Sequence, residues 1–96
     1  MKTEITEAIS QMVTIELRYS GYIRTVEPHA YGRDKSGEEI LRCFQVSGGS
    51  ESGEVTGWKL LKVADAYAIQ RTKTKFSPRP EYRRNDRAMQ FMFCQL

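Results

Sequence analysis

The feature that most constrains the fold is an alternation of apolar and polar residues on both sides of a Ser-Gly pair. It runs through residues 13–19 (VTIELRY) and resumes in residues 22–26 (YIRTV). A period of two predicts strands with one buried face, and Ser20-Gly21 between them predicts a tight hairpin turn. We therefore expect an antiparallel hairpin, whose second strand ends at Pro28 because proline has no N–H for the ladder.

Shorter patterns place the other elements. Apolar residues at helical spacing predict one helix over residues 5–12 and another at the end of the chain, where Asn85 is the expected N-cap and Met89, Met92, Phe93 and Leu96 form the stripe. Three more strands are predicted over residues 39–46, 58–63 and 67–72, separated by polar, glycine-containing loops at 31–38 and 47–57.

These elements predict a mainly β (α+β) fold. We expect a small, strongly bent antiparallel sheet, or a partly open barrel, of about five strands, with an N-terminal helix and a short C-terminal helix. A chain of 96 residues has room for one modest core. Residues 1–76 are therefore predicted to form the β domain, and residues 77–96 a basic, proline-containing segment and amphipathic helix that packs on it or on a partner.

The charge is distributed unevenly along the chain. Residues 1–57 hold six Lys/Arg and nine Asp/Glu, whereas residues 58–96 hold nine and three, so the two parts carry formal charges of −3 and +6. Much of the excess lies in a basic tail: Arg71, Lys73, Lys75, Arg79, Arg83, Arg84 and Arg87. A basic tail attracts phosphate, although a merely solvated surface has the same composition.

Several function classes find no support in the sequence. The longest apolar runs are too short to cross a membrane, and Glu4 and Glu7 interrupt the place of a signal-peptide core, so we expect a cytoplasmic protein. With one histidine, no phosphate-binding glycine loop and no nucleophile–base pair, we predict no enzyme, catalytic residue or cofactor. Cys43 and Cys94 are isolated, which favours free thiols over a disulfide and predicts no metal site.

Arg24 poses the main question of the sequence, because the alternation puts it on the more apolar face of its strand. A buried guanidinium needs a carboxylate such as Glu39, a set of carbonyls, or an anionic ligand. Arg42 stands in a similar pattern, and Lys59 and Lys62 flank two leucines. If these four cations converge, they form a basic face on neighbouring strands.

Aromatic residues accompany these cations. Tyr22, Tyr31 and Trp58 occupy the same strands or their ends, and His29 follows Pro28. Cations bind phosphates and aromatic rings stack bases, so the combination indicates a surface for single-stranded nucleic acid or a nucleotide. His29 and Tyr31 are predicted to be edge contacts. Structural roles for His29, Tyr31 and Trp58, in the core or at a loop exit, are the alternative.

The order of several residues resembles the WYL-domain family over about residues 5–76. The resemblance is carried by Ala8-Ile9, Ile15, Tyr19, Arg24, Val26 and Pro28, then by Trp58, Leu60, Lys62 and Val63, with Phe76 at the close of the domain. Of the Trp-Tyr-Leu tripeptide that names the family, only Leu41 matches. The resemblance implies an SH3-like or Sm-like small barrel and a regulatory, ligand-sensing role, typical of bacterial and phage proteins that bind nucleic acid or nucleotides.

Two functions are therefore carried forward. The first is a non-catalytic module that binds nucleic acid or a nucleotide-type ligand through Arg24, His29, Tyr31, Arg42, Lys59 and Lys62. The second is a protein-interaction or regulatory subunit, in which the C-terminal helix forms a homodimer or docks a partner and the cations are incidental.

Overall fold

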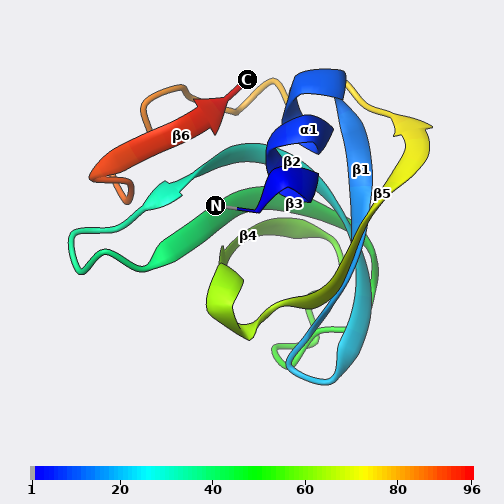
Figure 1. Cartoon of the computed structure of the whole chain (residues 1–96). Helices are drawn as coiled ribbons and strands as arrows, with labels where there is room; N and C mark the ends of the chain where they lie inside the picture. Colours follow the sequence, from blue (N-terminus) through cyan, green and yellow to red (C-terminus); the bar gives the residue numbers. More distant parts are fainter. Residues whose placement is uncertain (1) are drawn as a thin grey trace.

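The computed structural model describes residues 2–96, and it is mainly β (Figure 1). One α-helix and six antiparallel strands in a single sheet make up the described part of the chain. The elements are α1 (Thr3–Gln11), β1 (Val13–Tyr19), β2 (Tyr22–Arg33), β3 (Glu39–Gly48), β4 (Gly57–Lys62), the short 3-10 helix η1 (Val63–Asp65), β5 (Tyr67–Lys75) and β6 (Phe91–Gln95). The predicted mainly β class, the N-terminal helix and the first five strands are confirmed.

The long strand β2 organises the sheet. The strand order is β4-β3-β2-β1-β5, and β6 also pairs with β2. β3 runs along one edge of β2, while the other edge is shared: β1 pairs with its first part, up to Val26, and β6 with residues Ala30 to Arg33. The sheet bends strongly, and α1 lies close to β1 and β2 (Figure 1).

The core lies between α1 and the strands. Ile5, Ala8 and Ile9 of α1 are buried in one cluster with residues from β1 to η1, including Leu17 and Leu41. Burying such side chains is the main favourable term in folding. No helix within residues 2–96 combines the length and apolar character needed to cross a membrane.

The predicted hairpin turn is confirmed. Tyr19 pairs with Tyr22 across Ser20-Gly21. Both turn residues are left-handed, with φ of 52° at Ser20 and 81° at Gly21, as in the mirror-image turns that match the twist of paired strands. The alternation also holds beyond the turn, because Arg24 and Val26 are buried whereas Ile23 is 48% exposed.

The prediction that Pro28 ends the second strand is wrong. β2 continues to Arg33, so residues 31–33 belong to the strand rather than to the predicted loop. The register against β3 shifts between Pro28 and Ala30. Such a bulge accommodates a residue that cannot donate to the ladder, and here it coincides with His29.

The prediction of a C-terminal helix is also wrong. Phe91–Gln95 form β6, and Asn85 is no N-cap: its φ is 63°, and its N–H donates to the side-chain oxygen of Gln95. A helix of about 12 residues is marginal by itself, whereas the edge of β2 beyond Val26 offers backbone partners for a strand. Pairing with β2 therefore outweighs the local pattern.

Candidate functional site

Residues 76–90, here called the strap, pack against the outer face of β2, β3 and β4. Arg79 anchors the strap: its Nε lies 2.8 Å from Oε1 of Glu27 and its Nη2 3.1 Å from Oε2. The guanidinium carbon also lies 3.9 Å from the centre of the Phe44 ring. The Glu27 carboxylate raises the pKa of Arg79, so the guanidinium keeps its charge and both hydrogen bonds are charge-assisted.

His29 lies beneath the strap, completely buried. Its ring centre is 4.8 Å from that of Trp58, 5.4 Å from that of Phe76 and 4.9 Å from that of Tyr82. Nε2 accepts the backbone N–H of Arg79 at 3.1 Å, and Nδ1 is 2.9 Å from the carbonyl oxygen of Glu27. These two bonds define a neutral imidazole with its proton on Nδ1. Burial disfavours the charged form and lowers the pKa of His29.

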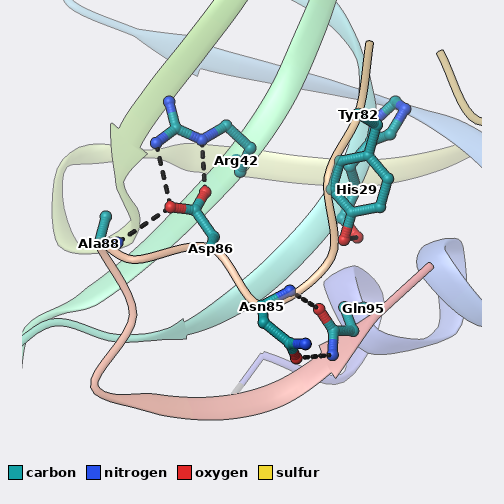
Figure 2. A network of polar contacts seen from close by, with 7 residues as sticks. All are labelled: His29, Arg42, Tyr82, Asn85, Asp86, Ala88 and Gln95. Atoms are coloured by element: carbon teal, nitrogen blue, oxygen red, sulfur yellow. Dashed lines mark hydrogen bonds and ion pairs between the residues drawn. The ribbon is translucent and has the colours of Figure 1, made fainter. Parts of the chain in front are cut away.

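Arg42 and Asp86 form the second anchor (Figure 2). The Asp86 carboxylate contacts Nε of Arg42 at 2.6 Å and Nη2 at 3.3 Å, and it also accepts the N–H of Ala88 at 3.0 Å. The hydrogen bonds from Arg42 hold the pKa of Asp86 below its usual value. Asp86 therefore stays ionised and fixes the strap to β3.

A groove with a volume of about 600 Å³ opens between the strap and β3–β4. Its lining residues are Arg42, Trp58, Glu81, Tyr82, Arg83, Arg84, Asn85, Asp86 and Arg87. Four arginines and two carboxylates leave a formal charge of +2 in this lining. Arg83, Arg84 and Arg87 are exposed, so three of these cations can reach a ligand from solvent.

An aromatic pair lies in the same groove. The rings of Trp58 and Tyr82 are nearly parallel, with an interplanar angle of 28° and centres 6.3 Å apart. The indole Nε1–H donates to a carboxylate oxygen of Glu81 at 3.1 Å, which fixes the ring orientation. Flat apolar faces beside arginines are the combination that binds bases and phosphates together.

The structure does not bring the six predicted site residues onto one surface. Arg42 lines the groove. Arg24, in contrast, pairs with Gly48, which lies six positions beyond Arg42 along β3. At about 3.3 Å per residue, Arg24 is therefore roughly 20 Å from Arg42 along the strand. Lys59 donates to the carbonyl oxygen of Glu54 at 2.8 Å, and the exposed Lys62 lies 3.8 Å from a Glu38 oxygen. The predicted convergence of four cations is therefore wrong.

Arg24 is buried by its own neighbours. Its Nε and Nη2 donate to the carbonyl oxygen of Tyr19 at 3.3 and 3.1 Å, and its Nη1 donates to the Gln45 side chain at 3.3 Å. The guanidinium carbon lies 5.2 Å from the Tyr19 ring centre and 5.8 Å from that of Tyr22. Of the three kinds of partner left open for Arg24, the structure therefore supplies carbonyl and amide oxygens, whereas Glu39, the example of a carboxylate, pairs with Arg33 at the opposite end of the ladder. Arg24 thus fastens the hairpin turn to β3.

His29 and Tyr31 were predicted as edge contacts, and both are fully buried. The Tyr31 hydroxyl donates to Glu39 and accepts the N–H of Lys2 at 2.8 Å. Burial raises the pKa of Tyr31, so the hydroxyl keeps its proton and both bonds. His29 therefore contributes to the groove through its ring contacts with Trp58 and Tyr82, not as an edge contact.

Sequence reasoning missed Tyr82 and Asp86 as groove residues. The arginines of the strap were recognised as a basic tail, but their spacing gave no sign that Arg42 and Trp58 would lie beside them.

No cluster of three or more His, Cys, Asp or Glu side chains suited to a metal ion occurs in residues 2–96. Comparisons with protein-family models, with curated proteins and with solved structures find no match for this chain.

Proposed function

We propose that this protein is a non-catalytic, ligand-sensing module that binds single-stranded nucleic acid or a nucleotide-type anion in the groove between the strap and β3–β4. The observation that carries the proposal is the set of arginines around the Trp58–Tyr82 pair. Arg83, Arg84 and Arg87 would bind phosphates, and the aromatic pair would stack a base. Of the six residues predicted from sequence, Arg42 is the one retained as a direct contact.

The resemblance to WYL domains supports the same proposal. It implies an SH3-like or Sm-like barrel and a regulatory, ligand-sensing role of the kind found in bacterial and phage proteins. The bent sheet with its N-terminal helix agrees with such a barrel in its coarse architecture. The groove, however, includes strap residues that lie beyond the region of resemblance, so its ligand contacts rest on this structure.

Binding can be measured without modifying the protein, since Trp58 is its only tryptophan. Titration with short single-stranded DNA and RNA should quench Trp58 fluorescence, and anisotropy of a labelled oligonucleotide should give the same dissociation constant. The affinity should fall as salt rises, because phosphate contacts release counterions. Free nucleotides added as competitors will show whether one nucleotide unit suffices.

A pair of matched double variants locates the contact. Arg83→Ala with Arg84→Ala removes two exposed charges of the groove, whereas Arg18→Ala with Lys73→Ala removes two exposed charges on β1 and β5. We expect the first pair to weaken binding about tenfold or more and the second to change it less than about twofold. Equal losses in both pairs would mean diffuse attraction, and absence of binding at low salt would refute the proposed function.

A further inference from the structure

Residue 29 is the point where the strap and the last strand are both fastened to the sheet. The His29 ring accepts the N–H of Arg79. Its backbone carbonyl accepts the Tyr82 hydroxyl at 3.3 Å and the N–H of Leu96 at 2.9 Å. The strap therefore depends on a side chain that can change its charge under mildly acidic conditions.

A second proton can bind this imidazole at one atom, Nε2. Nδ1–H already donates to the carbonyl oxygen of Glu27, so the proton would bind Nε2. Nε2 would then be a donor that faces the N–H donor of Arg79, and the hydrogen bond that holds the strap would be lost. A buried donor without an acceptor is costly, and movement of the strap relieves that cost.

The charged groups around His29 act in both directions. Glu27 on the same strand and Glu81 on the strap favour the protonated ring, whereas the Arg79 guanidinium opposes it. Glu27 is already bonded through both oxygens to Arg79. The Tyr82 phenol is neutral, because burial raises its pKa. Trp58 and Phe76 contribute apolar rings.

We propose that His29 is a pH-sensitive latch: the neutral ring holds the strap on the sheet, and protonation at Nε2 releases the strap and takes the groove apart. Trp58 would lose contact with Tyr82, and Arg42 would no longer face the arginines of the strap. The sheet itself would persist, since its core between α1 and the strands contains no strap residue. The release stands independently of the proposed function; only its effect on ligand binding rests on that function.

The direction of the pH dependence follows from burial. The pKa of His29 in the docked state is below the ordinary value of 6.5, and release of the strap would expose the ring and move its pKa back towards that value. Docking is therefore at full strength above about pH 6.5 and weakens as pH falls towards the docked-state pKa. The latch opens on the acidic side of neutrality and closes again when base is added.

The test follows Trp58 fluorescence between about pH 7.5 and pH 4.5, with circular dichroism recorded on the same samples. Wild-type protein should show a reversible emission change while the β-sheet signal remains. In His29→Gln the side-chain oxygen can still accept the Arg79 N–H but does not titrate, so this change should be absent. A wild-type signal that does not change, an equal change in His29→Gln, or simultaneous loss of the sheet would each overturn the latch.

Arg79→Ala tests the latch with His29 in place. The substitution removes the ion pair with Glu27, which weakens the docked strap, and it removes the cation that opposes protonation of His29. The pH midpoint of the Trp58 fluorescence transition should therefore move up towards pH 6.5. An unchanged or lower midpoint would contradict the proposal. Oligonucleotide titrations across the same pH range separate the proposed ligand binding from the release of the strap. A fluorescence transition without oligonucleotide binding at any pH would refute the proposed function alone. Binding that stays unchanged through the fluorescence transition would refute the effect of the latch on the ligand.

Discussion

The Asp86 carboxylate contacts the Arg42 guanidinium through both oxygens, at 2.6 Å from Nε and 3.3 Å from Nη2. A phosphate approaching Arg42 would need the same two N–H groups, because phosphate and carboxylate bind guanidinium in the same forked geometry. Asp86 therefore fastens the strap and also competes with any anionic ligand for the one groove arginine that belongs to the sheet.

Asp86→Asn should tighten oligonucleotide binding. The amide oxygen can still accept the Ala88 N–H, but the negative charge is gone and Arg42 is free to attract phosphate. We expect affinity to rise about threefold to tenfold, or ~1 kcal/mol, while stability falls by about 1 kcal/mol, since the Arg42 side chain is 29% exposed and the pair is only partly shielded. Anisotropy and thermal melting measure the two effects.

Asp65→Asn is the control for that experiment. Asp65 is exposed in η1 and does not line the groove, so its substitution changes the net charge by the same amount. Affinity should then change by less than about twofold. An equal gain in both variants would mean that net charge, not release of Arg42, governs binding.

Gly32→Ala should detach β6. A Cβ at this position would lie 2.2 Å from the backbone oxygen of Phe91, which cannot move without shifting the whole strand. We expect a loss of at least ~2 kcal/mol in unfolding free energy and faster hydrogen exchange over residues 91–95. Gly37→Ala is the contrast. Gly37 has a φ of 84°, and a Cβ added there would meet no atom within 4 Å beyond its chain neighbours. Only left-handed strain of about 1 kcal/mol should therefore appear, without any effect on β6.

The two thiols should differ strongly in reactivity. Complete burial raises the pKa of Cys43 to about 12, so about one thiol in ten thousand is ionised at pH 8. Cys94 is half-buried and its pKa is also raised. A chromogenic disulfide reagent should therefore modify Cys94 slowly and Cys43 only after unfolding. In Cys94→Ser, rapid modification of the folded protein would contradict this assignment.

Arg24→Ala should affect stability rather than binding. The variant loses the bonds to Tyr19 and Gln45 and leaves a cavity, which should cost about 2–4 kcal/mol. Arg24 lies roughly 20 Å from Arg42 along the ladder, so the folded fraction should bind oligonucleotide as the wild type does. Loss of binding with stability intact would instead place the ligand at Arg24.

Local pattern was enough to predict the elements that depend on neighbouring residues. The first hairpin, α1 and the buried position of Arg24 follow from periods of 2 and 3.6 and from a Ser-Gly turn. For Arg24 the sequence left three kinds of partner open, and the structure supplies carbonyl and amide oxygens. Those oxygens come from Tyr19 and Gln45, and nothing in their spacing distinguishes them from Glu39.

The groove could not be predicted, because its parts meet only after the strap has docked. His29 and Arg79 are 50 positions apart, and Arg42 and Asp86 are 44 apart. Neither pair leaves a periodic signal. The last strand was mistaken for a helix for a related reason: residues 85–96 satisfy a helical pattern, and the free edge of β2 that overrides it is a property of the assembled sheet.

The shared edge of β2 has a consequence for biosynthesis. Its stretch from Ala30 to Arg33 pairs with β6 on the edge that β1 leaves uncovered, so that edge has no partner until residues 91–95 have left the ribosome. During this interval the nascent chain exposes unpaired backbone groups next to the buried Tyr31, which is the kind of surface that captures strands of other chains. Yield in the cell should therefore depend on translation speed and on chaperones more than the size of the domain suggests.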